Sequence, residues 1–322
     1  MKKKPKKKEW ISILLFLLVL IVLLVIFDIQ KGEKVEMKKL YDVNGKPTIG
    51  YTELVVSDLE KMGVFYETVI GFKVLQKNEE EVRFTTDGEN TLLVLKEEKK
   101  APKRERGTTG LFHLALLLPE RSDLAAVIYH IQQQGYPIQV ASDHLYSEAI
   151  YLSDPEGNGI EIYRDKPSHA WKGNGKGGYV TDTLPMDIEG VMTSFKEETF
   201  KGLPEKTRMG HMHLQVASIE RSRDFYVDLL GFDVMTEGPG MLFLSKKNYH
   251  HDIGLNTWGG RNLPAPKEGS LGLSYFTIQV SEEDYQTIKE KLEKSAVAFQ
   301  EEESSLLLSD PSQNKIRIYR NH

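Results

Sequence analysis

The chain has 322 residues, of which 40% are hydrophobic and 28% are charged, a balance typical of a folded protein of about two domains. It contains no cysteine, which excludes disulfides, thiolate metal sites and cysteine nucleophiles. The net charge is −5, and since residues 1–8 carry six lysines, the rest of the chain is strongly acidic and disfavours nucleic acid as a partner.

The N-terminal segment has the pattern of a membrane anchor. A basic tail, residues 1–9, precedes an apolar stretch, 10–28, in which residues 11–27 carry no charge. As a helix this uncharged run spans roughly 26 Å, close to the apolar thickness of a bilayer, about 30 Å. It exceeds the hydrophobic stretch of a secretory signal, and no cleavage site follows in the linker 29–47. We therefore expect one uncleaved transmembrane helix, with the basic N-terminus in the cytoplasm and the following domains outside the cell membrane.

The remainder of the chain is an internal duplication. Residues 50–74 (GYTELVVSDLEKMGVFYETVIGFKV) align with 210–234 (GHMHLQVASIERSRDFYVDLLGFDV), with FY, GF and V in register. Residues 110–119 and 272–281 are similar in a looser way. We therefore expect two domains, each with two units of about 60 residues, and a connector between them. Their bounds are 48–165 and 208–320 for the domains and 166–207 for the connector.

Each unit begins with a strand, continues into a helix and ends with three short strands. In the first unit the periodicity predicts a helix over 58–69 that ends at Gly71. In the second it predicts a helix over 121–134, followed by Gly135 and Pro137. The fold class is therefore α+β, with four βαβββ modules that form two cup-shaped domains after one N-terminal transmembrane helix.

The first and last strands of the units turn polar side chains to one face. Residues 211–216 alternate imidazole or amide side chains with Met, Leu and Val, so the apolar face packs on the helix. His113 and Glu161 lie on the corresponding polar face of the second unit. A buried carboxylate is costly unless it is paired or binds a cation. The alternation predicts sheets that curl into polar-lined cups.

Several motifs of this sequence resemble a known superfamily. They include GHMHLQV at 210–216, DFYVDLLGF at 224–232 and DPEGNGIEIY at 154–163. With GLFHLALLLP and YHHDIGLNTWGGRN, they are similar to the vicinal oxygen chelate superfamily of glyoxalases, bleomycin resistance proteins and dioxygenases. Within it, the two-domain bacterial catechol-2,3-dioxygenase-like branch is the best match, over residues 48–320. The resemblance implies Fe(II), with Mn(II) as the alternative, held by two histidines and one carboxylate.

Neither half of the chain holds that ligand set alone. In the C-terminal half His211 matches the first ligand, but Tyr275 and Arg317 occupy the other two positions. In the N-terminal half Tyr51 occupies the position of the first histidine. A metal site therefore requires residues from both halves.

The second and third units together contain the complete set. The resemblance assigns His113, Glu161 and His211 as metal ligands and His251 as the acid–base catalyst. We therefore expect the second unit to pair with the third in a working cup, and the first with the fourth in a structural one. The plainer alternative is that the histidines are buried structural residues and that Glu161 pairs with Arg164.

Further side chains are candidates for substrate binding. These are His144, in a loop where related enzymes present substrate-contacting residues, His213, two residues after a ligand position, and His250. A structural role is the alternative for each. Trp258 is expected in a loop at the mouth of the cup, where it supplies an apolar wall.

The resemblance implies a ring-cleaving extradiol dioxygenase whose partners are a small catechol-like substrate and O2. The metal lowers the pKa of the diol hydroxyls, and a histidine moves the proton. A glyoxalase-like lyase or isomerase is one alternative. A non-catalytic small-molecule-binding protein of the resistance type, tethered to the membrane, is the other. The sequence leaves the substrate and the oligomeric state open.

Overall fold

The computed structural model describes residues 48–196, 200–246, 249–302 and 304–320. The predicted basic tail, membrane anchor and linker, residues 1–47, lie outside the described residues. Within the described part of the chain, no helix is both long enough and apolar enough to cross a membrane.

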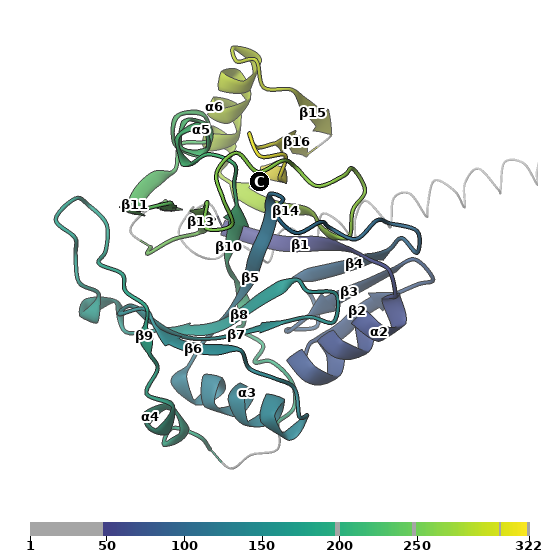
Figure 1. The fold of residues 1–322 in the computed structure, drawn as a ribbon, viewed down its shortest axis with the longest axis vertical. Coiled ribbons are helices and arrows are strands. Elements are labelled where there is room, and N and C mark those ends of the chain that lie inside the picture. The colour runs from purple at the N-terminus through teal and green to yellow at the C-terminus, as the bar shows by residue number, and fades with distance from the viewer. Residues whose placement is uncertain (1–47, 197–199, 247–248, 303, 321–322) are drawn as a thin grey trace, which may run out of the picture. The chain divides into compact units, whose positions relative to one another are not determined.

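Four βαβββ units make up the described chain, as predicted (Figure 1). The first contains β1 (Thr48–Val56), α2 (Leu59–Val64), the π-helical segment η1 (Phe65–Ile70), β2 (Lys73–Lys77), β3 (Glu81–Thr85) and β4 (Leu93–Glu97). The second contains β5 (Gly110–Leu118), α3 (Arg121–Gln133), β6 (Val140–Asp143), β7 (Ser147–Ser153) and β8 (Gly159–Asp165). The third contains β10 (Arg208–Gln215), α5 (Ile219–Arg223), the π-helical segment η3 (Asp224–Leu229), β11 (Asp233–Gly238), β12 (Met241–Ser245) and β13 (Ile253–Asn256). The fourth contains β14 (Gly272–Val280), α6 (Glu282–Glu293), β15 (Phe299–Glu302), β16 (Ser305–Ser309) and β17 (Lys315–Arg320).

Local sequence signals set the first helix. Asp58 caps it by accepting a hydrogen bond of 2.9 Å from the backbone N–H of Lys61. The helix continues through η1 to Ile70 and stops at Gly71, whose φ of 93° favours glycine. Both predicted helices are confirmed to within a few residues at their ends.

The strands form two sheets, and neither is built from one half of the sequence. The first and fourth units share an eight-stranded sheet, in the order β15-β16-β17-β14-β1-β4-β3-β2. The second and third share a nine-stranded sheet, in the order β11-β12-β13-β10-β5-β8-β7-β6-β9. The units join through antiparallel pairs, β1 with β14 and β5 with β10. The predicted pairing of the second unit with the third is therefore confirmed.

Apolar side chains on the helix-facing side of each strand make the core. Met212, Leu214 and Val216 are fully buried, in agreement with the predicted alternation. Figure 1 shows α3 against β6–β8 and α2 against β2–β4. Burial of each such large side chain contributes about 1.5–3 kcal/mol. The helices thus hold one face of each sheet, which leaves the opposite face for the polar side chains.

The connector 166–207 adds structure to the second sheet. It contains a short 3-10 helix (Ser168–Ala170), β9 (Leu184–Pro185) and α4 (Ile188–Met192). β9 pairs with β6, at the edge of the nine-stranded sheet. Asn174 and Thr236 make further hydrogen bonds between the connector and β11. The segment that the sequence indicated only as a link therefore closes over the cup of the second and third units.

Candidate metal centre

Three neighbouring strands place the proposed ligands in one row. In the parallel ladder of β5 and β8, Ala115 is the partner of Glu161. In the antiparallel ladder of β5 and β10, Ala115 is also the partner of His211. His113 lies two residues earlier on the same face of β5. Since the side chain between Glu161 and His211 is only a methyl group, the larger side chains converge above it.

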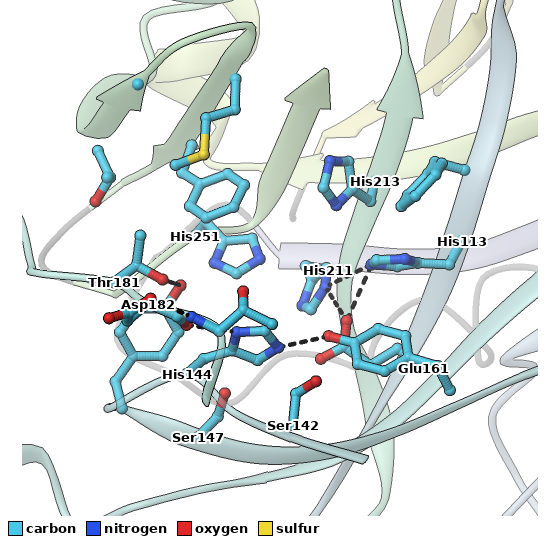
Figure 2. A pocket seen from close by; sticks show the side chains of 18 of the residues that line it. His113, Ser142, His144, Ser147, Glu161, Thr181, Asp182, His211, His213 and His251 are labelled. Atoms are coloured by element: carbon cyan, nitrogen blue, oxygen red, sulfur yellow. Dashed lines mark hydrogen bonds and ion pairs between the residues drawn. The ribbon is translucent and has the colours of Figure 1, made fainter. Parts of the chain in front are cut away.

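The donor atoms of this triad lie within contact of one another. Glu161 Oε2 is 3.0 Å from His113 Nε2 and 3.2 Å from His211 Nε2, and the two Nε2 atoms are 3.3 Å apart (Figure 2). Bonds of about 2.1 Å that meet at right angles around a metal ion hold their donor atoms about 3.0 Å apart. Two imidazoles and one carboxylate on one side of an ion suit a non-haem Fe(II) or Mn(II) centre with open positions. The residues present therefore fit the metal that the resemblance implies.

The protonation states also suit a metal. Burial alone would raise the pKa of Glu161, but its attraction to His211 and the hydrogen bonds from both imidazoles hold that pKa well below its usual range. Burial lowers the pKa of His113, against the opposing effect of Glu161. The carboxylate is thus ionised and the imidazole neutral, which are the forms that bind metal ions.

His251 lies beside the triad, just before β13. Its ring centroid is 4.2 Å from that of His211, and the ring stacks on Phe243 at 4.4 Å with an interplanar angle of 13°. Burial, reinforced by the unfavourable electrostatic effect of a charged His251 beside His211 and His250, lowers the pKa of His251 well below its usual value. A neutral imidazole at the edge of a metal site is suited to accept a proton.

His144, which lies near the triad in Figure 2, forms a hydrogen-bonded pair with Tyr151. His144 Nδ1 lies 2.9 Å from the backbone oxygen of Asp182, and a carbonyl only accepts, so Nδ1 carries a proton. His144 Nε2 lies 2.7 Å from the hydroxyl of Tyr151, which also forms a hydrogen bond with the carboxylate of Glu161. Tyr151 is also the direct partner of Glu161 in the ladder of β7 and β8. The pair therefore links Glu161 to the connector through a series of hydrogen bonds.

The other two candidate histidines lie in different surroundings. His213 lines the cavity, with its ring 4.7 Å from that of His113, and its buried Nε2 has no partner among the described residues. Phe112 and Trp258 flank it at 5.0 and 5.4 Å. His250 is not part of the cavity lining in the described chain, because its ring lies behind His251. His213 is therefore available to a ligand. His250, which we expected to bind substrate, lies outside the cavity lining.

The alternative partner of Glu161 is engaged elsewhere. Arg164 is directed to the other side of β8, where it binds Glu148. Glu148 also receives a two-pronged contact of 2.8 and 2.9 Å from Arg121. Glu161 is therefore left to the two histidines and to Tyr151.

The corresponding positions of the other sheet carry tyrosines and an arginine. The hydroxyl of Tyr51 lies 3.0 Å from that of Tyr275 and 3.3 Å from that of Tyr319. The guanidinium of Arg317 lies over the ring of Tyr275, 5.0 Å from its centroid. Within the described residues, the triad is the one cluster of histidines and carboxylates that could hold a metal ion.

A cavity of about 1280 Å³ opens onto the triad. Trp258 contributes to its wall, as predicted, together with Phe112 and Met241. Among the lining residues that were not predicted from the sequence, two sets lie close to the proposed chemistry. One is Tyr151, which the hairpin register of the turn 154–158 could have identified as the partner of Glu161. The other is the connector segment 179–183, for which the sequence carried no signal.

Comparison with known proteins agrees with this architecture. The family model for the Glyoxalase/Bleomycin resistance protein/Dioxygenase superfamily matches residues 48–162 and 208–317. The chain is 40% identical over 267 residues to a catechol-2,3-dioxygenase from Bacillus subtilis, covering 82% of this chain and 93% of that protein. Among solved structures, a Bacillus subtilis protein described as a dioxygenase aligns with a TM-score of 0.61 at 11% identity, covering 86% of each chain. Glyoxalase I from Zea mays aligns with a TM-score of 0.55 at 14% identity, covering 85% of this chain and 92% of that one. At these identities the two structures support the fold alone.

Proposed function

From the premise that this chain belongs to the glyoxalase, bleomycin resistance protein and dioxygenase superfamily, and is a dioxygenase, we propose that it cleaves the ring of a catechol-like diol in the extradiol manner. The observation that carries the proposal is the convergence of His113, Glu161 and His211 at the floor of the cavity. The 40% identical relative carries the name of this activity.

The triad would hold one divalent metal ion, with Fe(II) first and Mn(II) as the alternative. When bound, this ion supplies Lewis acidity to the two hydroxyls of the diol and the redox chemistry that O2 requires. The protein contributes the rest: it orients the diol, excludes water and moves protons.

Proton transfer falls to His251. Its ring is neutral, lies 4.2 Å from that of His211 and lines the cavity, so it can take the proton of a diol hydroxyl and later return it. The hydroxyl of Tyr151, which forms hydrogen bonds with His144 and Glu161, also lines the cavity and would contact the second hydroxyl of the diol. The two groups would fix the orientation of the diol between them.

The aromatic wall of the cavity would hold the ring of the substrate. Phe112 and Trp258 lie 5.5 Å apart at nearly a right angle, and His213 packs against both, with no partner for its Nε2 among the described residues. Such a wall packs against a planar apolar ring, while the imidazole offers one hydrogen bond. His213 would therefore be a substrate-contacting residue.

Oxygen uptake tests this proposal. The protein is purified without O2, loaded with Fe(II) or with Mn(II), and mixed with catechol and substituted catechols in an oxygen electrode. We expect one O2 consumed for each diol lost, and no uptake after chelation or in His211→Ala. The matched control is His169→Ala, on the exposed 3-10 helix of the connector, which should be as active as the wild type. A fully metal-loaded protein that consumes no O2 with any diol would contradict the proposal.

The two alternatives give different results in the same experiment. A small-molecule-binding protein would bind the diol without O2 uptake and would still bind it after chelation. A glyoxalase-like lyase or isomerase would act without O2 and calls for a further carboxylate or amide ligand. In the described chain no additional histidine or carboxylate joins the triad, which favours the dioxygenase.

The location is a proposal from sequence. Residues 10–28 would anchor the protein as a single-pass membrane protein, since 11–27 are uncharged and six lysines precede them. The catalytic units would then lie outside the cytoplasm.

A further inference from the structure

A chain of two short hydrogen bonds lies directly behind the proposed acid–base residue. Asp165 Oδ1 is 2.8 Å from His250 Nε2, and His250 Nδ1 is 2.8 Å from His251 Nδ1. Asp165 is the last residue of β8, the strand that carries Glu161, and it contacts the segment before β13. Two hydrogen bonds through the buried imidazole of His250 therefore connect Asp165 to His251.

Aromatic packing fixes the orientation of that imidazole. The ring of His250 stacks on Tyr146 with centroids 4.2 Å apart and an interplanar angle of 10°. Tyr249 covers it at 4.0 Å and Trp171, from the connector, at 5.2 Å. The residue is 1% exposed. His250 therefore has little freedom to turn away from either hydrogen-bond partner.

The carboxylate determines where the protons lie along this chain. A carboxylate accepts, so His250 Nε2 carries a proton and donates it to Asp165. Neutral His250 then has its lone pair on Nδ1, which can only accept from His251 Nδ1–H. His251 is consequently left with a lone pair on Nε2, the one ring nitrogen that His250 does not engage.

We propose that Asp165 and His250 are positioning residues that hold His251 in the tautomer with its proton on Nδ1 and its lone pair on Nε2, available at the cavity. Neither residue lines the cavity in the described chain, so neither is expected to touch the substrate. The consequence for catalysis rests on the proposed function: a fixed lone pair makes His251 a proton acceptor when the diol enters. A carboxylate can fix the tautomer of a catalytic histidine by a direct hydrogen bond. Here a second histidine, His250, lies between the carboxylate and His251.

Three variants separate the two hydrogen bonds. In His250→Gln the side-chain amide can reach the place of Nε2, so it can keep the hydrogen bond with Asp165 but not the one with His251. In His250→Asn the side-chain amide can reach the place of Nδ1, so it can keep the hydrogen bond with His251 but not the one with Asp165. Asp165→Asn can donate to His250 Nε2, which reverses the proton order along the chain. His169→Gln, on the exposed surface of the connector, is the matched control.

The first readout does not depend on activity. Ring-¹⁵N-labelled histidine in the metal-free protein at neutral pH reports which nitrogen of His251 carries the proton. We expect Nδ1–H in the wild type and in His169→Gln, a mixture of tautomers in His250→Gln, and a shift toward Nε2–H in Asp165→Asn. A wild-type His251 protonated on Nε2, or a tautomer unchanged in both His250→Gln and Asp165→Asn, would overturn the proposal.

The second readout is steady-state kinetics with the Fe(II)-loaded protein. We expect kcat to fall about 10-fold to 100-fold in His250→Gln and in Asp165→Asn, with KM for the diol and metal content nearly unchanged. The decrease in kcat should be smaller in His250→Asn than in His250→Gln, because the asparagine keeps a hydrogen-bond partner for His251. Equal losses in the two His250 variants would show that packing alone matters and would contradict the proposal. If no diol is turned over at all, the proposed function fails, while the tautomer measurement still decides the roles of Asp165 and His250.

Discussion

The Nε2 atoms of His113 and His211 lie 3.3 Å apart, although 98 positions separate the two residues along the chain. They meet because β5 of the second unit pairs with β10 of the third, across the midpoint of the duplicated sequence. A duplication that gave each half its own cup would have placed these histidines in different sheets. The metal centre is thus a product of how the units pair.

Removal of any one ligand should empty the metal centre. Each of His113→Ala, Glu161→Ala and His211→Ala leaves two donors, and two buried side chains do not hold a divalent ion against water. Elemental analysis after Fe(II) loading should give about one metal per wild-type chain and less than about a tenth of that in each variant. His130→Ala, which removes a histidine from α3 outside the cavity, should keep the metal. Retention of metal by two of the three ligand variants would contradict the assigned site.

The size of residue 115 should decide whether the triad can close on an ion. Ala115 lies between Glu161 and His211 and is fully buried. Ala115→Leu adds three carbons beneath the donors, and overpacking of this kind costs about 1–3 kcal/mol of stability. We expect the variant to fold with a lowered Tm and to lose most of its metal. Ala115→Gly, which leaves the space open, should keep the metal at a cost of about 1 kcal/mol. An Ala115→Leu variant with full metal content would show that the donors lie higher than the structure places them.

The ion pairs of Glu148 should make stability depend on pH. Burial would raise the pKa of Glu148, but its hydrogen bonds with Arg121 and Arg164 outweigh burial and lower that pKa. A group with a lowered folded-state pKa stabilises the fold above its unfolded pKa, about 4.3, and this stabilisation disappears as the pH falls through the folded pKa. Glu148→Gln should therefore lower the free energy of unfolding by about 3 kcal/mol near pH 7, and by less as the pH falls through the pKa of Glu148 in the folded protein.

Urea denaturation at several pH values measures this difference. The control is Glu301→Gln, which removes a more exposed partner of Lys289 and should cost less than about 1 kcal/mol at every pH. A loss for Glu148→Gln that stays constant from neutral to acidic pH would mean that the charge of Glu148 is not what stabilises the fold.

Deletion of the N-terminal segment should release the protein from the membrane. Residues 11–27 are uncharged, and within residues 48–320, as far as the structure describes them, no helix is long and apolar enough to span a bilayer. The full chain should remain in the membrane fraction after a carbonate wash, and a chain that begins at residue 35 should appear in the supernatant with its metal content unchanged. Recovery of both forms in the supernatant would remove the proposed anchor.

Much of the architecture could be predicted from the sequence. The duplication and the alternation of residues 211–216 identified the four units, the polar faces and the ends of the first two helices, because these depend on local periodicity and turn chemistry. The ligand positions His113, Glu161 and His211 followed from a resemblance, and the uneven distribution of ligands between the halves indicated how the units pair. These are properties of single strands and of short motifs.

The remaining features depend on contacts between side chains that are far apart in the sequence. Three features require contacts between strands or between the connector and the sheet. They are the place of His250 behind His251, the hydrogen bond between Tyr151 and His144, and the closure of the cavity by residues 179–183. A period of two along a strand determines which face a side chain occupies, but the register between strands and the path of the connector determine its neighbours. The sequence by itself therefore determined which residues face the cup. Only the tertiary structure decided which of them touch, because hydrogen bonds of 2.8 Å depend on the packing of elements far apart in the chain.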